Sequence, residues 1–275
     1  MSRSPMPVIR VENVTVRVGG IVALDGVSVN VNAREIFGLV GPNGAGKTTL
    51  LNVISGVVPA SKGRVFFEGN DITRIPLHRR VGIGIGRTFQ GGELFADLTV
   101  LENLLLGRHH LMKAGVLQAG LFFGSARQEE YRHRQAIEEA VDFFELERYR
   151  KSAVGVLPHG IQKIVGVARA ICSEPKLLLL DEVASGLNTQ EKEDLSRFLL
   201  RLKHTRPITM IWVEHDVRLV SELADSVTVL DHGRAVISGT AEEALRNPKV
   251  RAVFLGATRN QDVAGGARST AEQST

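Results

Sequence analysis

The most informative part of the sequence is Gly41-Pro42-Asn43-Gly44-Ala45-Gly46-Lys47-Thr48-Thr49. It fits the pattern G-x-x-x-x-G-K-[ST], follows the apolar run Ile36–Val40 and opens a stretch of helical character, Lys47–Val57. Glycines let backbone N–H groups wrap phosphates without side-chain clash, and a helix N-terminus adds partial positive charge. The pattern therefore predicts a nucleotide site in which Lys47 bridges the β- and γ-phosphates, Thr48 ligates Mg²⁺ and Thr49 bonds the α-phosphate.

Two further segments place acidic and basic groups at the ends of buried strands. The apolar run Leu177–Leu180 leads directly to Asp181 and Glu182, and Ile208–Val213 leads to His215. Ligands of open α/β sheets bind at the carboxyl ends of the strands. We expect Asp181 to orient the magnesium shell, Glu182 to polarise the attacking water, and His215 to sense the γ-phosphate.

The composition is that of an ordinary globular chain, with 275 residues, 43% hydrophobic residues and a net charge of +4. This slight, scattered charge gives no reason to expect a nucleic-acid partner. The single cysteine, Cys172, is interpreted as a small core residue. Neither a signal peptide nor a run of about 20 apolar residues is evident, so the sequence predicts a cytoplasmic chain that meets membranes only through partners.

The rest of the chain predicts an α/β core with a helical insertion. Alternating stretches near Val8–Val18 and Val27–Val31 indicate antiparallel strands. The segment from about 91 to 156 is mostly helical. It starts at a capping box, Thr99 to Glu102, and contains a charged helix over Gln128–Arg150. A second capping box is predicted further along the chain, from Thr240 to Glu243. Residues 257–275 are small and polar and are expected to be disordered.

Two segments of the insertion have open interpretations. The basic run Arg132–Arg134 is expected to lie on a solvated helix face. The apolar patch Leu117–Phe123 is expected to pack in the core, with docking against a membrane subunit as the alternative.

Taken in order, these motifs resemble those of an ATP-binding cassette (ABC) subunit over about Val8–Gly256. The resemblance implies a P-loop NTPase fold with an antiparallel β subdomain and the helical insert. Arg87-Thr-Phe-Gln90 resembles the family's Q-loop, which implies that Gln90 is a magnesium and water ligand. Ser185–Asn188 occupies the D-loop. The signature motif, which acts on the ATP of a second ATPase subunit in a homo- or heterodimer, falls on Leu157, Pro158, His159, Gly160, Ile161 and Gln162.

Smaller similarities point to the subunits that serve branched-chain amino-acid uptake. They include Leu98–Asn103, the helical insert after Gly107, and the ending Asn247-Pro-Lys-Val. The resemblance implies import of these or related small polar solutes. The implied partners are transmembrane permease subunits and an extracytoplasmic solute-binding protein, with the chain held on the inner face of the membrane.

Some positions depart from the family pattern. Val18 replaces the aromatic residue that stacks on adenine, a ring contact of about 1 kcal/mol. Pro158 replaces the signature serine, His159 follows it, and Val183 stands where a proline is usual after Asp181 and Glu182. The altered signature motivates one alternative, a regulatory nucleotide-binding subunit with little turnover. A second is a non-transport ABC protein.

Overall fold

The computed structural model describes residues 6–88, 94–112, 125–215, 217–250 and 252. Gln90, the patch Leu117–Phe123 and the tail 257–275 lie outside these residues.

A six-stranded sheet forms the centre of the molecule, in the order β10-β9-β3-β8-β7-β6. The strands are β3 (Ile36–Val40), β6 (Ile85–Arg87), β7 (Leu177–Asp181), β8 (Thr209–Glu214), β9 (Ser226–Asp231) and β10 (Arg234–Gly239). All neighbouring pairs are parallel except β9 with β10. Every residue of β3, β7 and β8 is buried, which is why these strands are mainly apolar along their length rather than alternating.

A second, antiparallel sheet has the order β2-β1-β4-β5. Its strands are β1 (Ile9–Val18), β2 (Ile21–Val31), β4 (Lys62–Phe67) and β5 (Asn70–Asp71). The turn between β1 and β2 is only Gly19-Gly20, because Val18 pairs with Ile21. The second predicted strand therefore begins six residues earlier than expected.

The two faces of the central sheet belong to different cores. Leu177 and Leu179 pack with α1 (Lys47–Ser55) and the antiparallel sheet. Leu178 and Leu180 pack with α6 (His159–Cys172) and α7 (Thr189–Thr205) on the opposite side. This period-two division along β7 leaves its last residue, Asp181, at the carboxyl edge between the two layers.

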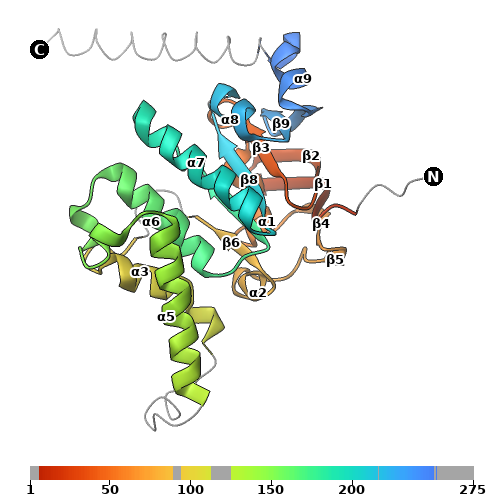
Figure 1. Cartoon of the computed structure of the whole chain (residues 1–275). Coiled ribbons are helices and arrows are strands. Elements are labelled where there is room, and N and C mark those ends of the chain that lie inside the picture. Colours follow the sequence, from red (N-terminus) through yellow and green to blue (C-terminus); the bar gives the residue numbers. More distant parts are fainter. Residues whose placement is uncertain (1–5, 89–93, 113–124, 216, 251, 253–275) are drawn as a thin grey trace, which may run out of the picture.

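The remaining helices include α2 (Leu77–Gly82), α8 (Val217–Leu223) and α9 (Ala241–Arg246) near the sheets. Beyond the edge of the central sheet, Figure 1 shows α3 (Val100–Gly107), α5 (Ser125–Phe143) and α6 together, with α5 extending away from the strands. Short 3₁₀ turns, η1 (His109–Leu111), η2 (Glu147–Tyr149) and η3 (Val154–Val156), lie in the same region. None of the helices in the described ranges is both long enough and apolar enough to span a bilayer.

Two expectations for this helical region were wrong. The charged helix ends at Phe143 rather than Arg150, because the chain turns at Glu145, which has a φ of 58°. His133 is buried, not solvated, although Arg132 and Arg134 are exposed. Its Nδ1 accepts a hydrogen bond from Arg108 Nε at 2.9 Å. The middle residue of the basic run therefore packs inside the protein, while its two arginines face solvent.

Other local expectations were confirmed. The capping boxes at Thr99 and Thr240 both form. Cys172 is a buried core residue, and burial raises the pKa of its thiol to about 12. Each of these features can be predicted from a short stretch of sequence, because it depends on neighbouring residues or on an apolar pattern.

Candidate functional site

The glycine-rich loop joins β3 to α1 and packs tightly against the β9–β10 hairpin. Gly41 has a φ of 156°, and a Cβ at that position would lie 2.2 Å from the carbonyl oxygen of Leu230. Gly46 has a φ of 101° and caps α1 without a side-chain hydrogen bond. The first N–H groups of α1 therefore have no side-chain cap and are available to an anion.

Lys47 is buried beneath this loop. Its Nζ donates to the carbonyl oxygens of Gly41 at 2.8 Å and Pro42 at 2.9 Å. Burial lowers the pKa of Lys47, while the carboxylates of Glu182, Asp181 and Glu214 oppose that shift. The ammonium group is thus held inside the loop, where a bound phosphate would be its stronger partner.

Asp181 ends β7 with its side chain fully buried. One oxygen, Oδ1, accepts from the Thr48 hydroxyl at 3.4 Å, and the other, Oδ2, forms an ion pair with Arg87 Nη2 at 2.9 Å. Burial raises the pKa of Asp181, and the Arg87 guanidinium opposes that effect. The contact between Thr48 and Asp181 joins two residues predicted to lie together; the role of Arg87 was not foreseen.

Glu182 turns away from the strand at the next position. It adopts a φ of 49°, and its N–H donates to the carbonyl of Val213 at 3.0 Å. This turn places Glu182, half-buried, on the wall of a cavity beside the glycine-rich loop. The sequence predicted the proximity but not the left-handed backbone.

His215 follows β8 and is half exposed, with Nδ1 3.9 Å from Oε2 of its neighbour Glu214. Glu214 itself is buried. Its Oε1 accepts from the N–H of Ala184 at 2.9 Å and from Trp212 Nε1 at 3.2 Å. Burial raises the pKa of Glu214. Sequence reasoning missed this carboxylate, although its place at the end of a buried strand beside His215 was a usable signal.

The cavity beside the loop has a volume of about 370 Å³. It is lined by Ile21, Val22, Ala23, Asn43, Gly44, Gly46, Lys47, Thr48, Thr49, Glu182, His232 and Gly233. Val18 does not line this cavity, and its side chain is 59% exposed. It pairs directly with Ile21, which does line the cavity. The cavity thus has a polar phosphate end on α1 and a less polar end at two hairpins.

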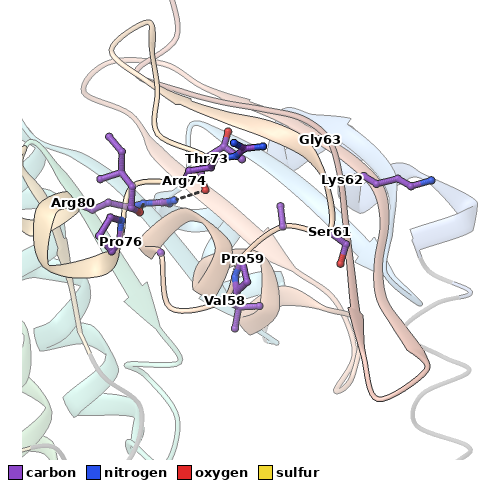
Figure 2. Close-up of a pocket in the computed structure, with 12 residues that line it drawn as sticks. Val58, Pro59, Ser61, Lys62, Gly63, Thr73, Arg74, Pro76 and Arg80 are labelled. Atoms are coloured by element: carbon purple, nitrogen blue, oxygen red, sulfur yellow. Dashed lines mark hydrogen bonds between the residues drawn. The ribbon is translucent and has the colours of Figure 1, made fainter.

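A second cavity, of about 480 Å³, lies near the C-terminal end of α1. Figure 2 shows Arg80 beside the loop that holds Thr73, with a dashed hydrogen bond between residues drawn there. The buried guanidinium donates to five carbonyl oxygens, those of Val53, Ile54, Ile72, Thr73 and Ile75. Burial lowers the pKa of Arg80 to about 10. Because its N–H groups are engaged with backbone, Arg80 is a structural residue.

None of the predicted signature residues lines the cavity beside the glycine-rich loop. α6 begins at His159 with Pro158 as its N-cap, and the N–H of Gln162 donates to the Pro158 carbonyl at 3.0 Å. Pro158 thus stands just before the helix, where its missing N–H costs no helical hydrogen bond. Gly160 packs against the side chain of Glu191, which belongs to the capping box that Asn188 makes at the start of α7.

Comparison with known proteins decides the family. A family model described as ABC transporter matches residues 24–185. The chain is 35% identical over 254 residues to the high-affinity branched-chain amino acid transport ATP-binding protein BraF of Pseudomonas aeruginosa, covering 91% of this chain and 98% of that one. It is 33% identical over 256 residues to LivG of Escherichia coli K12, a protein of the same description, with coverage of 91% and 98%. This chain belongs to the ABC transporter family.

The solved structures agree with the family assignment. The ADP conformation of MJ1267, an ATP-binding cassette of an ABC transporter, matches with a TM-score of 0.80 and 32% identity. That match covers 91% of this chain and 99% of the other. The predicted α/β P-loop fold and the predicted ABC ATPase subunit are therefore confirmed.

Within this cassette, the residues near the phosphate end suit one small divalent cation. The described residues contain no cluster of three or more His, Cys, Asp or Glu side chains able to hold a metal. Mg²⁺ is commonly bound by one or two protein oxygens together with waters and substrate phosphates. The Thr48 hydroxyl and the Asp181 carboxylate fit that requirement.

Proposed function

We propose that this cassette hydrolyses Mg²⁺-bound ATP to power uptake of branched-chain amino acids or related small polar solutes. The observation that carries the proposal is the single cavity shared by Lys47, Thr48, Thr49 and Glu182. The names of BraF and LivG support the solute class, since both describe branched-chain amino acid transport.

The phosphate end of the cavity assigns each group a task. The loop N–H groups and the N-terminus of α1 receive the phosphates, and Lys47 exchanges its carbonyl partners for phosphate oxygens. Thr48 and Asp181 would hold Mg²⁺, which would supply positive charge to offset that of the phosphates. Gln90 completes that set in our proposal.

The hydrolytic step falls to the residues after β7 and β8. Glu182 orients the attacking water and accepts its proton as the water oxygen bonds to the γ-phosphorus. The bond from the γ-phosphorus to the β–γ bridging oxygen breaks at the same time, and ADP is the leaving group. His215 contacts the γ-phosphate. Glu214 fixes the backbone after Glu182 by accepting from the Ala184 N–H, so it supports the geometry without reaching the nucleotide.

The site is completed in trans by a second ATPase subunit, either a copy of this chain or a related one. In this proposal the segment Leu157–Gln162 of each subunit faces the nucleotide of the other. The N-terminus of α6, which begins at the exposed His159, offers backbone N–H groups for that contact. Pro158 offers no N–H or hydroxyl donor.

The proposed partners outside the ATPase dimer are transmembrane permease subunits and an extracytoplasmic solute-binding protein. They would hold the chain on the cytoplasmic face of the membrane. The proposed domain division is one ABC ATPase domain over residues 8–256, with the helical subdomain inserted at about 91–156 and a separate tail at 257–275.

The proposal is tested first by nucleotide binding. Lys47→Ala removes the buried ammonium, so ATP affinity measured by calorimetry should fall by about tenfold or more, the scale of a charge-assisted contact of 1.5–3 kcal/mol. Lys192→Ala, a helix lysine outside the cavity lining, is the control. An unchanged ATP affinity in Lys47→Ala would contradict the assignment of the glycine-rich loop as the phosphate-binding site.

The regulatory alternative is favoured only by Pro158, and turnover decides it. Purified chain assembled with its permease subunits should hydrolyse ATP and accumulate a labelled branched-chain amino acid in vesicles. Nucleotide binding without turnover in that assembly would support the regulatory subunit instead.

A further inference from the structure

The Arg87 side chain connects three segments that meet beside the phosphate end of the cavity. Its Nη1 donates to Asn52 Oδ1 at 2.6 Å and to Ser55 Oγ at 3.0 Å, both on α1. Its Nη2 donates to Asp181 Oδ2 at 2.9 Å. Arg87 ends β6, which pairs in parallel with β7, the strand that carries Asp181.

These contacts divide the two oxygens of Asp181 between two partners. Oδ2 faces the guanidinium, and Oδ1 faces the Thr48 hydroxyl. The Asp181 side chain is fully buried, so water does not replace either of these two partners. A fixed carboxylate orientation is therefore set by Arg87 on one side and Thr48 on the other.

Through Arg87, the Asp181 carboxylate is also attached to α1. Thr48 lies in the first turn of α1, and Asn52 and Ser55 lie one and two turns further along the same helix. Arg87 thereby fixes Asp181 to the helix that carries Thr48. The Asp181 carboxylate is then linked through Arg87 to the helix that carries the Thr48 hydroxyl.

We propose that Arg87 is a positioning residue for magnesium, holding the Asp181 carboxylate against α1 so that one oxygen stays beside Thr48. The inference rests on the proposed function, since it assigns a role in the same metal site. Arg87 does not touch nucleotide in this role. It acts through Asp181, as outer partners of metal ligands do.

The orientation effect and the charge effect of Arg87 predict opposite results. A nearby positive charge on its own repels a divalent cation, so its removal would strengthen metal binding. If Arg87 acts mainly by orienting Asp181, its removal weakens metal binding, typically by 10–100-fold for such partners. The sign of the change therefore distinguishes the two roles.

The experiment measures metal and nucleotide binding separately in the full chain. In Arg87→Met, the Kd of Mn²⁺ for the protein–ATP complex, measured by electron paramagnetic resonance, should rise about tenfold or more. The Kd of ATP measured in EDTA should stay within about twofold, because the loop and Lys47 are untouched. Arg197→Met, which removes a half-exposed arginine paired with Glu145, should change neither value.

Arg87→Lys provides a second variant if Arg87→Met does not fold. One ammonium keeps a charge near Asp181 but lacks the planar fork that reaches Asn52, Ser55 and Asp181 together. An intermediate Kd for Mn²⁺ is expected. Unchanged or tighter Mn²⁺ binding in either variant would overturn the positioning role, as would an equal loss of metal-free ATP binding. Failure of the unmodified chain to bind ATP would instead refute the proposed function.

Discussion

At the scale of single residues, the buried Glu214 is expected to make the stability of the fold depend on pH. It is buried between Trp212 and Ala184, and burial raises its pKa above the value in the unfolded chain. Protonation is thus favoured by folding. The stability from this group is fully present below the unfolded pKa of about 4.5 and is lost as the pH rises through the folded pKa.

Glu214→Gln should therefore increase the free energy of unfolding at pH 7, because a neutral amide of the same shape replaces a buried charge. The gain should shrink as the pH falls toward 4, where the wild-type carboxyl is also neutral. Urea denaturation of both proteins across this range measures the difference. Glu193→Gln, on the exposed face of α7, is the matched control. A constant difference at all pH values would contradict the cause given.

The residues of the loop and of the strand ends were predictable because each belongs to a contiguous motif. Arg87 and Glu214 were not. The partners of Arg87 come from α1 and β7, and those of Glu214 come from β8 and the turn after β7. Such contacts depend on how the strands are ordered in the sheet, which a single sequence does not specify.

At the scale of elements, Arg80 joins the end of α1 to α2 and to the loop after β5. Arg80→Met would leave five carbonyl oxygens without the guanidinium, including those of Val53 and Ile54 in the last turn of α1. The expected loss of stability is about 1–3 kcal/mol or more, the scale for leaving a buried acceptor without its hydrogen-bond donor. Chemical denaturation measures it. The neighbouring exposed Arg79→Met should cost little, and equal effects of the two changes would refute the structural role.

The ends of helices were predictable where four neighbouring residues determine them, and were not predictable elsewhere. The helix starts at Thr99 and Thr240 were predicted because each capping box is contained in four residues. The end of α5 was misplaced, since the amphipathic pattern continues past Phe143 while the backbone turns at Glu145. Charge alone also failed to reveal that His133 turns inward to Arg108.

At the scale of the whole molecule, the altered signature predicts an unequal dimer when the second ATPase has an intact signature. Pro158 removes one hydrogen bond to a charged group, on the order of 1.5–3 kcal/mol before compensation by the α6 N-terminus or His159. The nucleotide held by this chain should then be hydrolysed faster than the one held by its partner. Glu182→Gln should abolish most turnover, and the matching change in the partner should cost much less. Equal losses would contradict this asymmetry.

The central claim is that this chain hydrolyses ATP with Glu182 as the group that activates water. The most direct measurement is steady-state ATP turnover of the assembled transporter, with wild-type chain and with Glu182→Gln, alongside nucleotide binding by both. Glu182→Gln retains the shape of the side chain but removes the base, so it should bind ATP and stall, with turnover reduced by about 10²–10⁴-fold. Undiminished turnover in Glu182→Gln would contradict the account.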